Sequence, residues 1–459
     1  MRTLRLLWMP ALALALPAMA PIGGCAGKAA AVSDDKACTA GNFVLCRCSD
    51  QREGTKQCSG DGMSFGACQP CPAESLPPGG DAGALPDDAG FTPVDASSVD
   101  AGFGPALDSA CNGKIAVLAS NASSDFTYSG VFVSGRSFSV SSSSGVPMLT
   151  PASIVAIDGK LVAAYRTRLD WVVSTTLTKF WSPPARIGSA ASQLGPAVVS
   201  WGGKLKAIFL GTDGRYHAAN YDPTSAAWDN AVENLGAADA GPGPGTSAPG
   251  VAGVGSPGVP GSAIVVGFSG ADGSLYRQSW YGSSWGGAIK SGAALGSDVG
   301  PLIVSLDGGT YDLLSVFVGA DKLMHAVTRG AQGTSFAWGV PGTVDGSAAP
   351  LDQPAVAPMR GGRALLVYRD ATSKPFYSVF DGSKSPPWSA PSELIVGANP
   401  TVASTPSVIQ GQCGEDASVA YAEKNGNVAI LRFAAGAWTG PYVVGGMTRM
   451  TFASIGELP

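Results

Sequence analysis

The stretch Pro196-Ala-Val-Val-Ser-Trp201, Gly202-Gly203, Lys204-Leu-Lys-Ala-Ile-Phe209, Gly211-Thr-Asp-Gly214, followed by Trp228, contains the unit that decides the fold. It consists of a proline, a short apolar run, a glycine turn, a β-run ending in an aromatic, a second turn and a tryptophan. The same unit returns around Trp181, Trp285, Trp338, Trp388 and Trp438, at steps of 47, 57, 53, 50 and 50 residues. A repeat of this length is typical of a propeller or an array of repeats.

Each repeat predicts four β-runs. In the quoted repeat they are 196–201, 204–210, 215–221 and the run around Trp228, and Asp213-Gly214 is a hairpin turn that tolerates positive φ. One position, near the end of the second run, is aromatic in every full repeat: Tyr165, Phe209, Phe268, Phe317, Tyr368 and Tyr421. We expect these aromatics and the tryptophans to pack between neighbouring sheets. The Gly/Pro-rich stretch 236–261 interrupts the repeats and is interpreted as a long inter-blade loop.

The two ends of the body hold complementary fragments of a repeat. Residues 111–118 match a second run without a first, Ala119 fills the aromatic position, and Phe138 stands where a tryptophan is expected. Residues 451–455 (Thr-Phe-Ala-Ser-Ile) look like a lone first run. We therefore predict an all-β fold: a seven-bladed β-propeller of four-stranded blades over 111–459. One blade is shared between the N- and C-terminal segments, so that no sheet edge is left free. A Cys111–Cys413 disulfide is predicted to lock this closure.

The first 24 residues predict an export signal. Arg2 and Arg5 precede the apolar run 6–20, which is too short and too proline-broken for a spanning helix. Residues 22–25 (Ile-Gly-Gly-Cys) resemble a bacterial lipobox, which implies lipidation of Cys25. Because alanine follows this cysteine, the resemblance also implies an outer-membrane lipoprotein in the cell envelope, exposed to the periplasm or cell surface. The alternative is an ordinary signal peptide that ends near a cysteine. Contact with the membrane is expected only through the N-terminal lipid anchor.

Between the anchor and the body we expect a small module and a tether. Residues 25–37 form an anchor or linker, and 38–71 hold six cysteines, whose pairing as disulfides suits an exported segment too short to build a core. A zinc knuckle is the alternative, since residues 68–71 have ligand spacing. Residues 72–110 are acidic, lack Lys and Arg, and are rich in Pro, Gly and Ala, which predicts a disordered linker. Calcium binding is a weaker interpretation because no EF-type spacing is present.

Composition excludes several classes of function. Only 14% of residues are charged and the net charge is −5, without a basic run, so nucleic acid is not an expected partner. The chain has two histidines, which argues against a His-built metal site, and we predict no metal and no cofactor. The 63 glycines and 34 prolines fit a β-rich fold with many turns.

Residues 211–217 (Gly-Thr-Asp-Gly-Arg-Tyr-His) and 270–277 (Gly-Ala-Asp-Gly-Ser-Leu-Tyr-Arg), each followed by a tryptophan, resemble seven-bladed lectin propellers of the fucose-binding and related (PLL) type. The resemblance implies carbohydrate or glycoconjugate bound in shallow sites between blades by aromatic, arginine and polar side chains. The fucose-type pattern also needs an acidic partner in each site. No recurring acid is found here, which argues against fucose itself.

Two groups of side chains are candidates for ligand contact. A polar side chain recurs near the start of the third run, and two arginines follow their aromatic positions; these are His217, Arg277, His325, Tyr377, Arg166 and Arg369. Three further aromatics offer stacking surfaces for a sugar: Trp171, Trp280 and Tyr281. The alternatives are exposed outer-strand residues for the first group and inter-blade packing for the second.

Two other function classes compete with a lectin. A sialidase-like glycoside hydrolase needs carboxylates aimed at one site. The inner runs beginning at Pro196, Pro301, Pro354 and Pro406 carry no acid, and no nucleophile elbow or phosphate loop is present, so we predict no enzyme. A protein-binding or structural propeller would need no sugar site. Binding on a glycan array would separate it from a lectin.

Overall fold

The computed structural model describes residues 43–47, 53–57, 59, 114–120, 127–133, 136–143, 148–178, 181–229, 233–235, 245–296, 299–331, 337–344, 346–347, 349–394, 401–411, 416–444, 447 and 450–457. The chain divides into two compact units, Met1–Pro93 and Val94–Pro459. In the first unit, β1 (Phe43–Arg47) and β2 (Glu53–Gln57) pair as an antiparallel hairpin. The predictions for Cys25, for the pairing of the clustered cysteines and for the acidic linker lie outside the described residues.

The second unit is built from antiparallel sheets of consecutive strands. The first sheets contain β6 (Ser153–Ile157), β7 (Lys160–Arg166), β8 (Trp171–Leu177) and β9 (Ala185–Ala191); then β10 (Ala197–Trp201), β11 (Lys204–Leu210), β12 (Tyr216–Asp222), β13 (Ala227–Trp228) and β14 (Glu233–Asn234); then β15 (Gly250–Val254), β16 (Ala263–Ser269), β17 (Ser274–Trp280) and β18 (Ile289–Ala294). We call each sheet a blade and name it by its strands.

Three more blades follow in the same order. They contain β19 (Leu302–Ser305), β20 (Tyr311–Val318), β21 (Met324–Gly330) and β22 (Gly342–Thr343); β23 (Ala355–Met359), β24 (Arg363–Arg369), β25 (Pro375–Asp381) and β26 (Ser392–Glu393); and β27 (Ser407–Gln410), β28 (Ala417–Ala422), β29 (Val428–Ala434) and β30 (Ala437–Val444). The remaining sheet has the order β31-β3-β4-β5, from β31 (Phe452–Glu457), β3 (Lys114–Ser120), β4 (Thr127–Val133) and β5 (Arg136–Ser143). The described residues of this unit thus form seven sheets.

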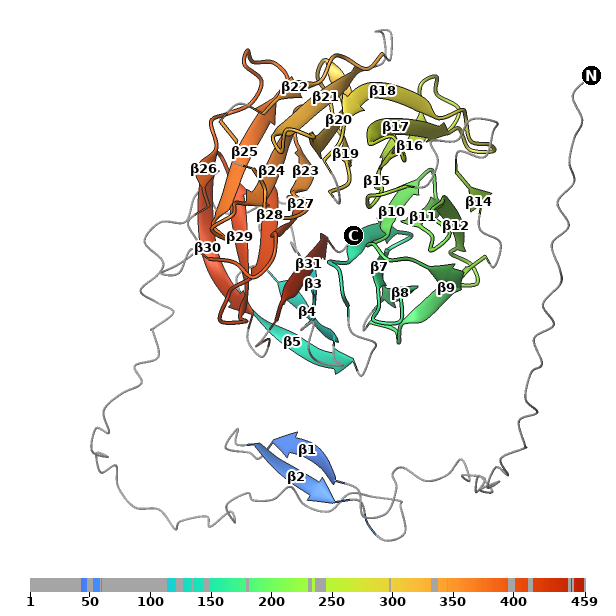
Figure 1. Ribbon diagram of the computed structural model, residues 1–459. Coiled ribbons are helices and arrows are strands. Elements are labelled where there is room, and N and C mark those ends of the chain that lie inside the picture. Colours follow the sequence, from blue (N-terminus) through green and yellow to red (C-terminus); the bar gives the residue numbers. More distant parts are fainter. Residues whose placement is uncertain are drawn as a thin grey trace, which may run out of the picture. The chain divides into compact units, whose positions relative to one another are not determined.

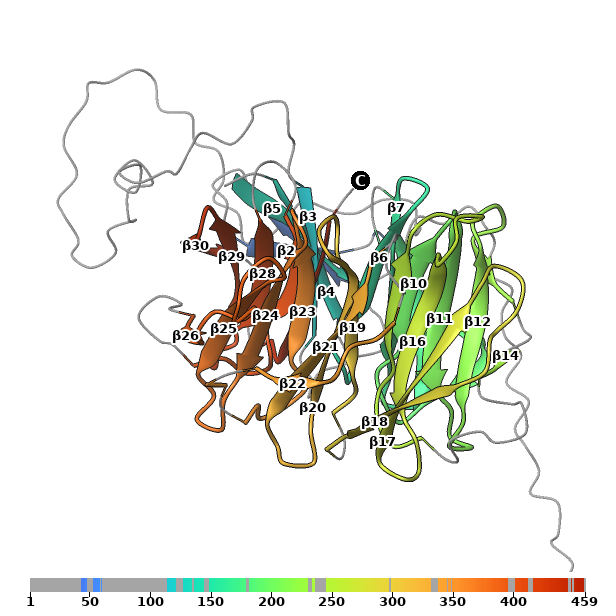
Figure 2. The ribbon, with the colours of Figure 1, turned by 90° about the horizontal axis from the view of Figure 1, so that it is seen from above.

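These sheets stand around a common centre, as in a β-propeller (Figure 1). The first strand of each sheet contacts the first strands of its two neighbours, in the cyclic order β6, β10, β15, β19, β23, β27, β31 and back to β6. Figure 2 shows the blades side by side from above. The predicted junction of the chain ends is confirmed, because β31 pairs with β3 from Ile115↔Glu457 to Ser120↔Phe452. Whether Cys111 and Cys413 form a disulfide lies outside the described residues.

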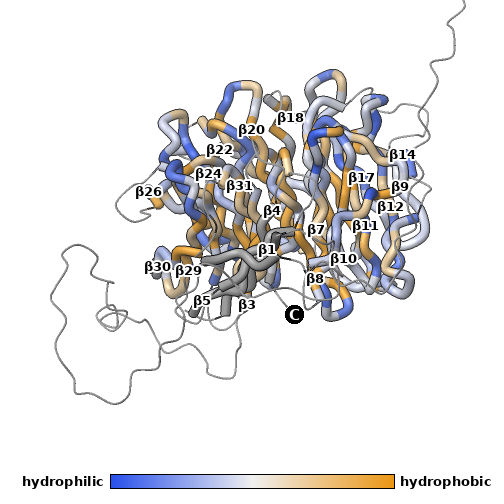
Figure 3. The backbone as a smooth tube through the Cα atoms, turned by 90° about the horizontal axis from the view of Figure 1, so that it is seen from below, coloured by the Kyte–Doolittle hydropathy of each residue, from blue (hydrophilic) through white to orange (hydrophobic). Residues whose placement is uncertain are grey.

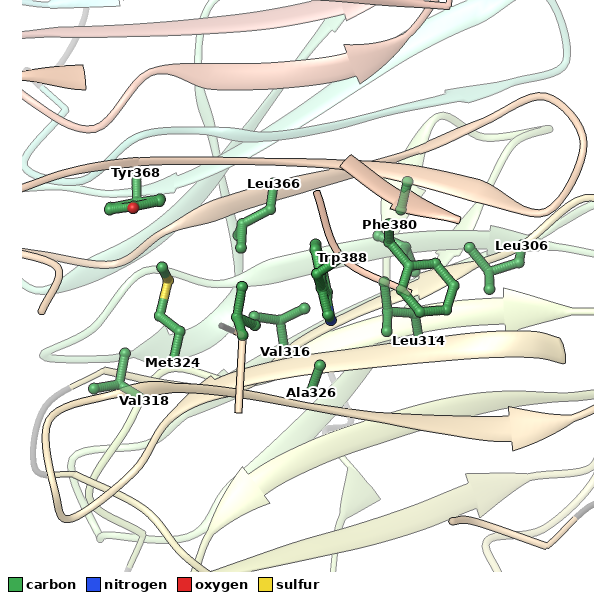
Figure 4. Close-up of a cluster of buried hydrophobic side chains, with 13 residues drawn as sticks. Leu306, Leu314, Val316, Val318, Met324, Ala326, Leu366, Tyr368, Phe380 and Trp388 are labelled. Atoms are coloured by element: carbon green, nitrogen blue, oxygen red, sulfur yellow. The ribbon is translucent and has the colours of Figure 1, made fainter. Parts of the chain in front are cut away.

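Packing between blades follows the predicted pattern. The aromatic at the shared position of the second strand is almost fully buried in each full repeat: Tyr165, Phe209, Phe268, Phe317, Tyr368 and Tyr421. Figure 4 shows one such interface, where Tyr368, Phe380 and Trp388 meet Leu314, Val316 and Met324 from the preceding blade. Second strands are covered on both sides, so they are nearly continuous apolar runs, whereas polar residues gather in the turns (Figure 3).

The interpretation of residues 236–261 as one long loop is wrong, because β15 lies within this stretch. The strand was hidden by its glycines, which are needed for close approach of the inner strands. A Cβ on Gly250 would lie 2.0 Å from the carbonyl oxygen of Pro301, and one on Gly253 would lie 3.0 Å from Cβ of Trp201. Glycine therefore has a packing role here rather than marking a loop.

Candidate functional site

The structure separates the recurring third-strand residues into two groups. His217 pairs with Phe209 and His325 with Phe317, and the residues at the same register in the next blades are Tyr276 and Phe376. All four stack on their aromatic partner, with ring centroids 5.5–6.2 Å apart. Arg277 and Tyr377 are one residue further along, so grouping them with the histidines is wrong. A shift of one residue places a side chain on the opposite face of the strand.

The two histidines form matching pairs with turn aspartates. Nε2 of His217 lies 2.9 Å from Oδ1 of Asp213, and Nε2 of His325 lies 3.0 Å from Oδ1 of Asp321. For Asp213, burial raises the pKa of the carboxyl, but the hydrogen bonds from His217 and the turn outweigh it, so the pKa lies below its ordinary value. For Asp321, the hydrogen bond from His325 is the main cause of a lowered pKa. In both repeats the same aspartate also accepts a backbone N–H from the hairpin turn. These pairs therefore brace the hairpin tips.

Arg277 and Tyr377 lie at the seams between blades, where the tryptophan of the following blade packs. The guanidinium carbon of Arg277 lies 3.9 Å from the ring centroid of Trp338, and the ring of Tyr377 lies 5.2 Å from that of Trp438. At the same register in an earlier blade, Ser174 accepts a hydrogen bond of 2.7 Å from Nε1 of Trp228. Side chains at this third-strand register therefore contact the tryptophan of the following blade.

A cluster of charged, amide and aromatic side chains occupies the seam between blade β10–β14 and blade β15–β18. We call it the Lys206 seam. Lys206 on β11 is 1% exposed, and its ammonium donates hydrogen bonds of 3.1 Å to both carboxylate oxygens of Glu233 on β14. The same nitrogen also donates to Oδ1 of Asn220 and lies 4.3 Å from the ring centroid of Trp280. The cation is therefore enclosed by a carboxylate, an amide and an indole.

Asn220 fixes two carboxylates at this seam. Its Nδ2 donates to Oδ2 of Asp229 at 2.7 Å and to Oε1 of Glu233 at 3.0 Å, and its backbone N–H donates to Oδ1 of Asp229 at 2.9 Å. Glu233 also accepts a hydrogen bond of 2.6 Å from Nε1 of Trp285, which belongs to the following blade. The network therefore joins the two blades through one carboxylate.

The protonation states follow from this network. Burial lowers the pKa of the Lys206 ammonium below its ordinary value, although the hydrogen bond to Glu233 opposes this effect. Burial likewise raises the pKa of Glu233. Hydrogen bonds from Asn220, Trp285 and Lys206 outweigh that effect, so the pKa of Glu233 lies below the ordinary value of 4.5. At neutral pH Glu233 is therefore an ionised acceptor, and 37% of its side chain is open to solvent.

Aromatic and amide groups complete the rim of the seam. Trp285 is half-buried, and Tyr281, which is 61% exposed, lies close enough that a Cβ on Gly286 would be 3.3 Å from its ring. Gln278 donates to the backbone oxygen of Gly286 at 2.8 Å, and its Oε1 is buried without a hydrogen-bond partner. Of the sequence-predicted candidates, Trp280 and Tyr281 belong to this seam. Trp280 itself is 5% exposed and forms the floor under Lys206 rather than an open platform.

The fold does not require charges at these positions. In the other full repeats the residues at the position of Lys206, three before the buried aromatic, are Val162, Val265, Leu314, Leu365 and Ser418. At the register position of Glu233 they are Ala185, Ile289, Gly342, Ser392 and Tyr442. Burying a charge costs free energy even when it is paired. The cluster is therefore specific to one seam and is not part of the repeat's packing.

The remaining candidates lie elsewhere. Arg166 is held by Asp170 at 2.6 Å, and Arg369 is held by Asp352 at 2.8 Å, so each equivalent arginine has a carboxylate partner. Trp171 on β8 is 37% exposed, with the guanidinium carbon of Arg186 at 5.0 Å from its ring centroid. None of these three is brought together with the Lys206 seam.

A separate cavity of about 700 Å³ lies beside the turns that join first and second strands. It is lined by the turn 254–255 and 259–262, by residues 305–309, 311–312 and 331, and by Pro358 and Gln410. Its charged wall is Asp307 and Asp312, and Asp312 is already bound by Arg329 at 2.7 Å. The walls are otherwise mainly backbone and glycine, so the cavity presents fewer directed side chains than the Lys206 seam.

The similarities found among solved structures are to propellers. The fucose-specific lectin from Aleuria aurantia has a TM-score of 0.46 and 16% identity, over 66% of this chain and 98% of the lectin, and is described as six-bladed. AofleA from Arthrobotrys oligospora has a TM-score of 0.47 and 14% identity, over 68% of this chain and 90% of that chain. A protein from Bacteroides uniformis provisionally named a 6-phosphogluconolactonase has a TM-score of 0.48 and 11% identity, over 75% of this chain and 100% of that chain. At these values the similarities do not indicate what this chain binds. No protein-family model and no curated protein sequence matches the chain.

Sequence reasoning missed Lys206, Asn220, Asp229 and Glu233. The signal for Lys206 was present, since it is the one charged residue among those positions of the six second strands. Glu233 lies on a strand of two residues, and its partner is far from it in sequence, so spacing alone could not place it beside Lys206.

Proposed function

We propose that the chain binds a neutral carbohydrate at the Lys206 seam, without catalysis. The observation that supports this most is the Lys206–Glu233–Trp285 cluster, which spans two blades at positions that are apolar or small in most other repeats. Sugar hydroxyls need directed donors and acceptors, and a sugar's apolar face packs against aromatic rings. Glu233 and Asp229 supply acceptors, while Trp285 and Tyr281 supply aromatic surface. We infer that the seven sheets act as blades of one closed ring in which the chain ends share a blade.

Binding is favoured over hydrolysis by the state of Glu233. A glycoside hydrolase needs one carboxyl that is protonated at working pH and one that is ionised. Hydrogen bonds hold the pKa of Glu233 below its ordinary value, so this group is not a general acid near neutral pH. Turnover of fluorogenic glycosides, abolished by Glu233→Gln, would overturn this part of the proposal.

The test is a glycan array with the full chain, followed by calorimetry on the sugars that bind. Tyr281→Ala is the most informative variant, because Tyr281 is 61% exposed and we expect its loss to leave the fold intact. We expect it to weaken binding by roughly the value of one stacked aromatic, about 0.5–1.5 kcal/mol. The matched control is Glu393→Gln, a carboxylate on the corresponding short strand of another blade, which should bind like the parent chain. Absence of binding across a broad array would instead favour a protein-binding propeller.

We also propose that the chain is exported and anchored in the cell envelope through lipid on Cys25. The support is the sequence of residues 1–25 alone. Cys25→Ser should abolish labelling by a radioactive fatty acid and release the protein from membranes. Equal labelling of both forms would contradict the anchor without affecting the proposal for the seam.

A further inference from the structure

Arg277 carries a buried positive charge on the other side of blade β15–β18 from the Lys206 seam. It lies on β17, opposite Gly267 and Ile289, and is 7% exposed. Its side chain turns to the following blade, where the guanidinium carbon is 3.9 Å from the ring centroid of Trp338. We call the interface between blade β15–β18 and blade β19–β22 the Arg277 seam.

No described residue satisfies the hydrogen-bond donors of this guanidinium. Its Nε is buried without a partner, and among the described residues Arg277 makes no ion pair. Stacking on Trp338 does not replace these bonds, because the five N–H groups of a guanidinium lie in its plane and the indole covers its face. Four other arginines show the usual solution, a carboxylate within 2.8 Å: Arg166, Arg329, Arg363 and Arg369.

No described carboxylate offsets the cost of burying this charge. Burial alone lowers the pKa of Arg277 to about 10, with no described carboxylate acting against it, and the group is still charged at neutral pH. The Lys206 seam, on the opposite face of blade β15–β18, also buries a cation, but there the carboxylate of Glu233 forms an ion pair with it. The two seams differ in that, among the described residues, none supplies an anion to Arg277.

Packing does not explain the arginine either. At the same register the other full repeats have Ser174, Ala218, Ala326, Tyr377 and Ile430. Ser174 and Tyr377 meet the tryptophan of the next blade without a charge. A cation held flat against an indole, with its donor edge unsatisfied, is an arrangement suited to an incoming planar anion.

We propose that the Arg277 seam binds a carboxylate, presented by an acidic sugar, through the free edge of the guanidinium. Trp338 holds the guanidinium plane, so the two parallel N–H groups can bind both oxygens of the carboxylate. Entry is from the outer rim, where Ile289 is 71% exposed opposite Arg277 and Val340, two residues after Trp338, is 92% exposed. This site is independent of the neutral-sugar site proposed for the Lys206 seam.

The test is calorimetry of the full chain with D-glucuronate, acetate and D-glucose. We expect glucuronate to bind, glucose not to bind at this seam, and the affinity for glucuronate to fall with added salt. Arg277→Met should abolish glucuronate binding, and Arg277→Lys should weaken it by about tenfold or more, because the two-pronged contact is lost. Arg215→Met, at an exposed arginine of the neighbouring blade, is the matched control and should bind glucuronate like the parent chain.

A second measurement separates a ligand site from a structural role. Without ligand, Arg277→Met should unfold at the same or a higher temperature, because it removes an uncompensated buried charge. A lower unfolding temperature would mean that the arginine serves the fold, and would overturn the proposal. Glucuronate binding that survives Arg277→Met, or no binding of glucuronate or acetate, would also overturn it. Acetate binding as tight as glucuronate would assign the site to the carboxylate alone.

The same titration keeps this proposal distinct from the one for the Lys206 seam. Tyr281→Ala alters only the Lys206 seam, so it should reduce neutral-sugar binding and leave glucuronate binding unchanged. Arg277→Met should do the reverse. Loss of both activities in either variant would show one shared site and would contradict the assignment of the carboxylate to the Arg277 seam.

Discussion

Removing the two partners of the Lys206–Glu233 pair should have unequal effects on stability. Lys206 is 1% exposed, whereas 37% of the Glu233 side chain is open to solvent. Glu233→Gln therefore leaves a fully buried ammonium that has lost its hydrogen-bonded carboxylate. Lys206→Met leaves a carboxylate that keeps its contact with water and its hydrogen bonds from Asn220 and Trp285. The glutamate variant should be the less stable of the two.

The magnitudes follow from the exposure of each group. Breaking a buried ion pair by removing one partner costs about 3–5 kcal/mol. Because Glu233 is partly screened by water, we expect Glu233→Gln to cost about 2–3 kcal/mol. Lys206→Met should cost about 1 kcal/mol, since the methionine fills much of the same apolar space beside Trp280. The double variant Lys206→Met with Glu233→Leu should lie within about 1 kcal/mol of the parent chain, because a hydrophobic replacement of a buried pair is often neutral.

Urea unfolding of the full chain, followed by tryptophan fluorescence, measures these differences. The parent, both single variants and Lys206→Met combined with Glu233→Gln form a double-mutant cycle, whose coupling energy isolates the pair. The variant with Glu233→Leu tests the hydrophobic replacement separately. The matched control is Lys374→Met with Glu393→Gln, an ion pair of 3.3 Å between half-exposed side chains, which should change stability by less than about 1 kcal/mol. Equal losses for the two single variants, or a larger loss for Lys206→Met, would refute the argument from burial.

Four further outcomes are expected. The pKa of Glu233 in the folded chain lies below 4.5, so its contribution to stability is present above that pH and is lost as the pH falls through the lower folded-state value. The free energy of unfolding should therefore fall less steeply with acid in Glu233→Gln than in the parent. Tyr368→Ala should cost about 3–5 kcal/mol in urea unfolding, whereas Tyr281→Ala should stay within about 0.5 kcal/mol, since only the first ring is buried. Deletion of 452–457 should expose the edge of β3 and cause self-association, visible by size-exclusion chromatography against the full chain. Mass spectrometry of a non-reduced digest should show Cys111 joined to Cys413, and free thiols at both would contradict the predicted lock.

The fold was predictable because the signals that set it are local and repeated. A proline, an aromatic and a tryptophan return at nearly constant spacing, and each marks a packing requirement that every blade must meet. The closure was predictable for the same reason. The sequence of β31 resembles the other first strands, and β3 matches a second strand with no first strand before it in the chain. The strand β15 was missed because its glycines are required by close contact with the inner strands of neighbouring blades. That contact arises only when the blades are assembled and leaves no local signal in the sequence.

The candidate site was predicted less well than the fold. An error of one residue in aligning the third strands joined Arg277 with His217, although these side chains lie on opposite faces of their blades. The acidic partner was missed because it does not recur: Glu233 appears in one blade and reaches Lys206 from 27 residues away. The repeat pattern reveals the packing residues that every blade shares. It does not reveal the proposed site, whose charged residues occur in one blade alone.

That argument also explains why both proposed sites flank the same blade. Blade β15–β18 has Lys206 and Glu233 packed against one face, through Trp280 and Trp285, and it presents Arg277 from the other. In a ring of similar sheets, a buried charge persists only if a partner or a ligand offsets its cost, because a serine, alanine or leucine would fill the space. Glu233 meets that condition for Lys206 within the chain. For Arg277 no described residue meets that condition. The proposal therefore assigns the compensating anion to a ligand, and the anion-free chain should be at least as stable without the arginine.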